Sequence, residues 1–232
     1  MLINNKGDIY NLDTNTERKK SILNGRDNEA IPILLEIHCN TLTPKILDCT
    51  HNKGTMWKGL TYDLTTMDID PQFNTDYVAD FRKMPFEDDS FDVIVFDPPH
   101  LPIASATEHA SKIWETRYGL NDIKGNGRDG DNVSEMFYPF LMEAKRVLKQ
   151  DGIILAKIAD LTHNHRYQWQ HVDLINTVRK VGLTPCDMLI KVDPSAGNLQ
   201  SSKWKNIKHL RKSHCFWIVI RNSNKCECKT VK

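Results

Sequence analysis

Short apolar runs alternate with segments of helical periodicity along most of the chain. Apolar residues spaced three or four positions apart predict helices over about 28–39, 133–149 and 168–181. Runs typical of buried strands lie before, between and after these helices, at 45–49, 65–69, 76–80, 91–97, 152–159, 186–192 and 214–221. Nearly continuous apolar strands that alternate with helices are typical of a parallel sheet covered on both faces. The pattern therefore predicts a doubly wound α/β fold with a mostly parallel, seven-stranded sheet.

The segments outside this pattern set the expected domain boundaries. Residues 1–27 are polar and lack a sustained period, so we expect an irregular N-terminal arm. One α/β domain is expected over 28–222, with a long loop at 101–133, and a basic polar tail at 223–232. The connection after 65–69 is too short for a helical crossover, so either a loop replaces that helix or the strand boundaries differ.

Charge is balanced in total but not along the chain. The 31 basic and 30 acidic side chains give a net charge of +1, which by itself predicts neither a nucleic-acid partner nor an acidic ligand. Residues 61–100 hold ten acids and two bases, a net charge of −8, whereas residues 201–232 hold nine bases and one acid, a net charge of +8. The basic end is therefore a candidate phosphate-binding surface.

Cysteine spacing and hydropathy exclude several classes of protein. The six cysteines are scattered, and the Cys226–Cys228 pair has no second pair or histidine at zinc spacing, so no metal site is predicted. No apolar stretch approaches the roughly 20 residues of a membrane span. The polar start lacks the apolar region of a signal peptide, so we expect a cytoplasmic protein.

Acidic residues mark the ends of the first four predicted strands. They are Asp48, Asp68, Asp80 and Asp97, the last within Asp97-Pro98-Pro99-His100. The carboxyl ends of parallel strands meet at one edge of the sheet, where ligands bind. A carboxylate at the end of the second strand can accept hydrogen bonds from both hydroxyls of a ribose. The sequence therefore predicts a ligand site at this edge.

This series resembles the class I S-adenosylmethionine-dependent methyltransferases, and specifically the DNA amino-methyltransferases, whose fourth strand ends in [D/N/S]-P-P-[aromatic]. The resemblance covers about 45–100, and more loosely the element order through 222. It implies a Rossmann-like methyltransferase catalytic domain over 28–222 with S-adenosylmethionine as the cofactor. Asp68 would take the ribose, and Asp80 and Phe81 would border the adenine. The other cofactor-binding residues that it implies lie on the loop after the first strand, and they are Asp48, Cys49, Thr50, Asn52, Gly54 and Thr55.

Two positions depart from the family pattern. Asn52 stands at the first glycine of the usual D-x-x-x-G-x-G loop. Asparagine is the non-glycine residue that best tolerates a positive φ, so we expect the turn to persist. His100 stands where the family has tyrosine, phenylalanine or tryptophan, and its smaller ring would stack on a base less strongly. Trp57, just after the loop, is expected to pack rather than to contact a ligand.

The spacing of the Asp97-Pro98-Pro99-His100 motif suits methylation of an exocyclic amine. Such an amine is a poor nucleophile because its lone pair is delocalised into the ring. Asp97 can accept one amine proton and the Pro98 carbonyl the other, while the two prolines fix φ and hold that carbonyl in place. His100 would stack on the base. The predicted catalytic residues are therefore Asp97, Pro98, Pro99 and His100.

Two segments are candidate nucleic-acid contacts. The 101–133 loop is too long for an ordinary connection and mixes cationic with aromatic residues, namely Trp114, Arg117, Tyr118, Lys124 and Arg128. The stretch before the last strand is basic, with Lys203, Lys205, Lys208, Arg211 and Lys212. The alternatives are a disordered insertion for the loop and a solvated lysine-rich tail for the basic stretch.

The expected function is methylation of an exocyclic amine of a nucleic-acid base, with N6 of adenine in DNA as the first candidate. RNA adenine N6 comes next, followed by cytosine N4 in DNA, which we associate more with serine at the first motif position. A catalytically silent nucleic-acid-binding subunit and a small-molecule or protein N-methyltransferase are the alternatives from other classes. A homodimer or a complex with a partner subunit is compatible with all of these.

Overall fold

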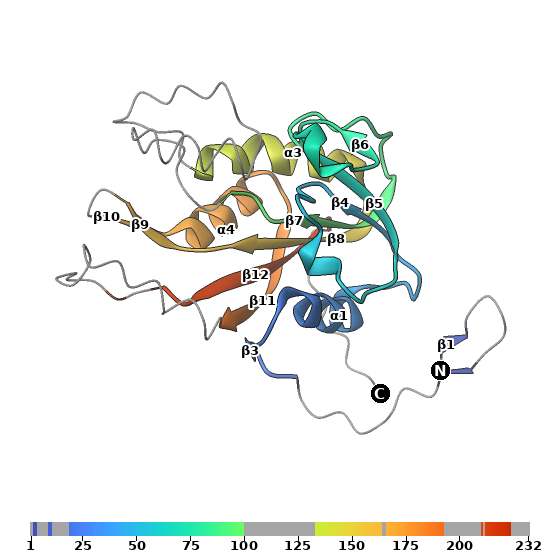
Figure 1. Cartoon of the computed structure of the whole chain (residues 1–232), viewed down its shortest axis with the longest axis horizontal. Helices are drawn as coiled ribbons and strands as arrows, with labels where there is room; N and C mark the ends of the chain where they lie inside the picture. Colours follow the sequence, from blue (N-terminus) through green and yellow to red (C-terminus); the bar gives the residue numbers. More distant parts are fainter. Residues whose placement is uncertain are drawn as a thin grey trace.

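An eight-stranded mixed sheet forms the centre of the computed structural model (Figure 1). The structure describes residues 2–3, 9–10, 19–99, 133–163, 166–192, 210 and 212–223. The strand order is β3-β11-β12-β8-β7-β4-β5-β6. The bounds are β3 Ile22–Asn24, β4 Lys45–Asp48, β5 Asp63–Asp68, β6 Tyr77–Val78, β7 Phe91–Phe96, β8 Leu148–Ile158, β11 Thr184–Val192 and β12 His214–Arg221. All neighbouring strands are parallel except β12, which runs antiparallel to both β8 and β11.

Helices cover both faces of this sheet (Figure 1). They are α1 (Asp27–His38), α3 (Phe137–Val147) and α4 (Gln170–Lys180), with the short 3-10 helices η1 (Thr55–Trp57), η2 (Pro71–Phe73) and η3 (Val133–Met136). Two further antiparallel pairs lie outside the sheet, β1 (Leu2–Ile3) with β2 (Ile9–Tyr10), and β9 (Leu161–His163) with β10 (Arg166–Gln168).

The apolar strands supply two separate cores because side chains alternate across a strand. Along β7, Val93 and Val95 pack in the cluster that includes α1 and η1. Ile94 and Phe96 point to the opposite face and pack in the cluster that includes α3 and α4. Since β7 is central and apolar on both faces, its carboxyl end is held rigidly, and this end carries Asp97.

The predicted fold class is confirmed, with three corrections and one open alternative decided. The prediction of an irregular arm is wrong for 22–24, because Ile22 and Leu23 pair in parallel with β11 and add an eighth strand. The short connection after β5 is η2, so a single 3-10 turn replaces the crossover helix. Strand β8 begins at Leu148 rather than at 152, and the β9–β10 hairpin follows it without a signal in the apolar pattern.

Membrane-spanning character can be judged for the described helices. None of them combines the length and the apolar composition that crossing a membrane requires.

Candidate active site

A cavity of about 600 Å³ lies at the carboxyl ends of β4, β5, β7 and β8. Its volume is within the usual range for small-molecule and cofactor sites, about 300 to 1,000 Å³. The structure brings most of the predicted cofactor-binding and catalytic residues together here: Cys49, Thr50, Asn52, Thr55, Asp68, Asp80, Phe81, Asp97, Pro98 and Pro99 all line the cavity. Sequence reasoning missed other lining residues, notably Lys157 from β8 and Glu135 and Met136 from η3.

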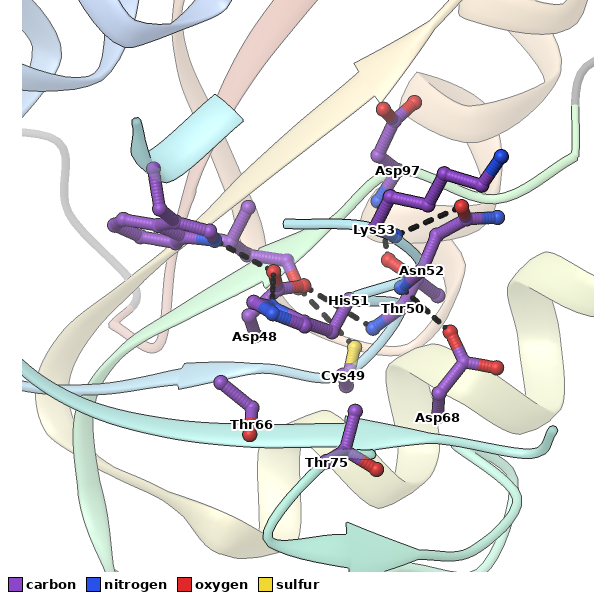
Figure 2. Close-up of polar contacts among 12 residues, drawn as sticks. Asp48, Cys49, Thr50, His51, Asn52, Lys53, Thr66, Asp68, Thr75 and Asp97 are labelled. Atoms are coloured by element: carbon purple, nitrogen blue, oxygen red, sulfur yellow. Dashed lines mark hydrogen bonds and ion pairs between the residues drawn. The ribbon is translucent and has the colours of Figure 1, made fainter. Parts of the chain in front are cut away.

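Asp48 does not line the cavity, although it was predicted as a cofactor ligand. Its carboxylate is fully buried and lies beneath the loop that follows β4 (Figure 2). There Oδ2 accepts hydrogen bonds from Trp57 Nε1 at 2.6 Å and from His51 Nδ1 at 2.9 Å, and Oδ1 accepts one from the backbone N–H of Thr50. Asp48 therefore holds the loop in shape, and Trp57 packs as expected.

The loop turns through two left-handed residues. Asn52 has φ 51° and Gly54 has φ 61°, so the expectation that asparagine sustains a positive φ at the first family glycine is confirmed. Gly54 is not among the residues that line the cavity, although it was predicted as a cofactor-binding residue, and its role is steric. A Cβ at this position would lie 2.6 Å from His51 Nε2, so any other residue would displace the imidazole that Asp48 holds.

His51 links this turn to Asp48, and this contact shifts the pKa of its imidazole. Burial disfavours the imidazolium, but the hydrogen bond and charge of Asp48 prevail and raise the pKa of His51 above its usual 6.5. A raised folded-state pKa means that the pair stabilises the fold fully below the unfolded-state pKa. This contribution is lost as the pH rises through the folded-state value.

We therefore expect His51→Gln to lower the melting temperature at acidic pH more than at alkaline pH. A hydrogen bond to a charged group contributes about 1.5 kcal/mol or more, which corresponds to roughly 3 to 6 °C for a domain of this size. Thermal unfolding of the wild type and of His51→Gln at several pH values checks this expectation. A range from about 5.5 to 9 spans the usual histidine pKa. Parallel curves for the two proteins would show that the His51–Asp48 pair does not respond to pH.

Asp68 ends β5 and faces the cavity while it supports two loops. Its Oδ2 accepts a hydrogen bond from the Asn52 N–H at 2.8 Å (Figure 2). Its Oδ1 accepts one from the Asp70 N–H at 3.0 Å. Burial raises the pKa of this carboxyl, although the two backbone hydrogen bonds oppose the shift. A carboxylate oxygen has two lone pairs, so each oxygen retains acceptor capacity after one backbone bond.

Asp80 and Phe81 form an adjoining part of the wall. Burial disfavours the Asp80 carboxylate, but hydrogen bonds from Arg82 Nε to both of its oxygens, at 2.9 and 3.0 Å, hold the pKa of Asp80 below its usual range. Phe81 packs edge-on against Phe96 and Phe140, whose rings stack with centroids 3.6 Å apart. This corner therefore offers an aromatic surface beside a fixed carboxylate.

Asp97 is joined to both the loop and the sheet. Its backbone N–H donates to Thr50 Oγ1 at 2.8 Å, so the loop after β4 and the Asp97-Pro98-Pro99 segment are tied directly together. Its Oδ2 lies 2.9 Å from Lys157 Nζ, near the end of β8. Two strand ends and one loop thus fix the position of this carboxylate at the cavity.

Lys157 belongs to a chain of four partly buried charges. Its Nζ also lies 3.0 Å from Asp27 Oδ2 on α1, and Asp27 Oδ1 in turn lies 3.1 Å from Lys191 Nζ on β11. Trp217 Nε1 donates to the same Asp27 oxygen at 3.2 Å. Burial opposes the charge of Lys157, but Asp97 and Asp27 raise its pKa well above the usual value, so it is a cation at neutral pH. The only sequence signal is a lysine within the apolar run of β8.

The remaining predicted site residues lie mostly outside the described residues. These are His100, Trp114, Arg117, Tyr118, Lys124, Arg128, Lys203, Lys205, Lys208 and Arg211, together with the Cys226–Cys228 pair. Lys212 is described, and its Nζ lies 4.1 Å from the centroid of the Tyr167 ring. Within the described part of the chain, no three His, Cys, Asp or Glu side chains are grouped so as to hold a metal ion.

Comparison with known proteins identifies the fold. No protein-family model and no curated protein sequence matches the chain. Among solved structures, a candidate sarcosine dimethylglycine methyltransferase from Galdieria sulphuraria is 13% identical, with a TM-score of 0.52 and coverage of 85% of both chains. A candidate methyltransferase from Bacillus halodurans C-125 is 11% identical, with a TM-score of 0.49 over 84% of this chain and 99% of the other.

A third structure contains a bound ligand. It is 1,6-didemethyltoxoflavin-N1-methyltransferase from Burkholderia thailandensis with 1,6-didemethyltoxoflavin and S-adenosylhomocysteine. It is 11% identical, with a TM-score of 0.49 over 84% of this chain and 77% of the other. The sheet order and the likeness to the Galdieria sulphuraria protein define the class: this chain has the Rossmann-like fold of the class I methyltransferases.

Proposed function

We propose that this protein is an S-adenosylmethionine-dependent methyltransferase that acts on an exocyclic amine of a nucleic-acid base, with N6 of adenine in DNA as the first candidate. One observation carries the proposal. Asp97, Pro98 and Pro99 open into the same cavity as Asp68 and Phe81, so a fixed acceptor for an amine lies in the same space as groups suited to a nucleoside.

The cavity residues fit S-adenosylmethionine by their chemistry. The two oxygens of Asp68 suit the ribose hydroxyls. Phe81 suits the face of an adenine and Asp80 suits its edge. The Thr50–Asn52 turn borders the rest of the cavity. When bound, S-adenosylmethionine supplies a methyl group activated on a sulfonium. Asp48, which lies beneath the loop, would act on the cofactor only by shaping the turn.

Asp68→Ala should weaken binding of S-adenosylmethionine by about 10- to 100-fold, because a charge-assisted acceptor contributes roughly 1.5 to 3 kcal/mol. Asp68→Asn, which keeps one acceptor oxygen, should lose less. Calorimetry on both variants measures the difference, and thermal unfolding controls for the two backbone bonds that Asp68 also accepts. An unchanged affinity in Asp68→Ala would contradict the ribose assignment.

The chemistry proposed for the target amine uses two acceptors at the end of β7. The Asp97 carboxylate accepts one hydrogen of the amine and the Pro98 carbonyl accepts the other. Two such bonds favour a more tetrahedral nitrogen with an available lone pair, and the fixed φ of both prolines keeps the carbonyl in place before the substrate binds. In-line positioning of this kind can contribute on the order of 7 to 11 kcal/mol at best.

Nucleoside mass spectrometry tests the target directly. The protein is incubated with methyl-labelled S-adenosylmethionine and with DNA or RNA, the product is hydrolysed, and Asp97→Ala serves as the matched control. N6-methyladenine from DNA supports the proposal, whereas label only in RNA or on cytosine N4 moves the target to those alternatives. Absence of label from both polymers would favour a silent subunit or a small-molecule substrate. The contacts proposed for the 101–133 loop and for the 203–212 stretch remain predictions, as does a partner subunit or homodimer.

A further inference from the structure

An exposed aromatic and cationic cluster lies on the β9–β10 hairpin and at the start of α4. Trp169 is 57% exposed, and its ring centroid is 4.3 Å from that of Tyr167 on β10. Lys212, which precedes β12, places its Nζ 4.1 Å from the centroid of the Tyr167 ring. The neighbouring Arg166 is also exposed. We call Tyr167, Trp169 and Lys212 the hairpin platform.

The hairpin platform is supported from beneath by a buried carboxylate. Asp160 is 3% exposed and accepts hydrogen bonds from Tyr167 Oη at 2.9 Å and from His171 Nδ1 at 2.7 Å. Burial and the bond to Asp160 raise the pKa of Tyr167 to about 12, so its hydroxyl remains a donor. His171 stacks on Phe216 of β12 with ring centroids 4.3 Å apart. The Tyr167 ring is therefore anchored through Asp160, two residues after the end of β8.

Asp160, which holds Tyr167 of the hairpin platform, is near the cavity along the chain. Asp160 follows Lys157 by three residues, so their Cα atoms are at most about 11 Å apart. Helix α4, which begins directly after Trp169, contacts η3, and η3 contributes Glu135 and Met136 to the cavity wall. In Figure 1 the hairpin extends beyond the end of β8, with α4 beside it. A nucleic-acid strand with one base in the cavity could therefore place a neighbouring nucleotide on the hairpin platform.

The chemistry of the hairpin platform fits an unpaired base and its phosphate. Base–aromatic stacking is worth about 1 to 3 kcal/mol per base and tolerates any sequence, because every base has a flat face. Lys212 supplies positive charge beside the Tyr167 ring, and the exposed Arg166 is the next residue along β10. Two acids lie nearby. Asp160 already accepts hydrogen bonds from Tyr167 and His171, and Asp173 lies in the first turn of α4. An exposed indole next to a second ring that contacts a lysine suits nucleic acid better than an apolar polypeptide.

We propose that the hairpin platform binds a single-stranded segment of nucleic acid, with a base next to the target stacked on Trp169 and its phosphate paired with Lys212. This inference rests on the proposed function, since it assigns the substrate of the same site. It also specifies the form of that substrate, because stacking on Trp169 requires a base that is not paired within a duplex.

Binding assays with Trp169 variants test this inference. Fluorescein-labelled DNA and RNA oligonucleotides of mixed sequence, single-stranded and duplex, are titrated with wild type, Trp169→Ala and Trp169→Phe. We expect Trp169→Ala to bind the single strands about 5- to 150-fold more weakly, the range that corresponds to one lost stack. Trp169→Phe should retain most of the affinity, and binding to the duplex should be weaker for all three proteins. Wild-type tryptophan fluorescence should be quenched by unlabelled oligonucleotide, and Trp169→Phe should lose part of that quenching.

The two proposals can fail separately. Affinity for S-adenosylmethionine should be unchanged in Trp169→Ala, because Trp169 is not among the residues that line the cavity. If the wild type binds single strands and Trp169→Ala binds them more weakly, but no base is methylated, the hairpin platform stands and the proposed function fails. If bases are methylated but Trp169→Ala binds and turns over like wild type, the hairpin platform is overturned. Failure of the wild-type protein to bind any oligonucleotide also overturns it.

Discussion

Asp97→Ala should lower the rate of methyl transfer at least about 100-fold and change the affinity for S-adenosylmethionine much less, because losing the acceptor that we propose for the amine would mainly affect the transition state. Asp97 is the first residue after β7 and its N–H is bonded to Thr50, so the backbone of the loop remains in place when only the carboxylate is removed. Single-turnover rates with saturating substrate separate this effect from binding.

Asp97→Asn is the matched control. Asparagine occurs at the first position of the motif in the family that the sequence resembles, and its amide oxygen can still accept an amine hydrogen. We therefore expect Asp97→Asn to retain more activity than Asp97→Ala, although both lose the ion pair to Lys157. Near-normal turnover in Asp97→Ala would remove the role assigned to this residue. Equal losses in the two variants would show that charge at this position matters more than acceptor geometry.

The strand-end acids could be predicted because they follow from chain geometry alone. In a parallel sheet the residues after the strands meet at one edge, whether the strand is central, like β7, or lies at the end of the sheet, like β6. This reasoning placed Asp68, Asp80 and Asp97 at one cavity. It also placed Asp48 there, because sequence does not show whether a strand-end carboxylate points outward or beneath its own loop.

The charged chain behind Asp97 could not be predicted from the sequence. Asp27, Asp97, Lys157 and Lys191 belong to four different elements, and none of them is near another along the chain. Such a cluster depends on strand order and register, which the apolar pattern leaves open. The β9–β10 hairpin escaped prediction for another reason, because its six strand residues are too short a stretch to display an alternating pattern.

The same charged chain has a consequence for stability that a single substitution can show. Lys157 is paired with two carboxylates, and its side chain is only 14% exposed. Removing one partner of a buried pair costs about 3 to 5 kcal/mol because the remaining charge is left without compensation. Partial solvent access to Asp97 reduces that cost, so we expect Lys157→Met to lose about 3 kcal/mol, or roughly 6 to 12 °C in melting temperature. Lys157→Arg, which keeps the charge, should lose less.

A double-mutant cycle then separates the pair from general packing. Once Asp97 is replaced by asparagine, Lys157→Met no longer leaves a carboxylate at the end of β7 without its compensating charge. The stability lost in Lys157→Met should therefore be smaller by about 1 to 3 kcal/mol. Denaturant unfolding of wild type, both single variants and the double variant gives this coupling energy. Strictly additive losses would mean that Lys157 stabilises the fold only through Asp27 and packing. A large coupling would identify Lys157 as the positioning residue for Asp97 if Lys157→Met also turns over more slowly at temperatures at which it remains folded.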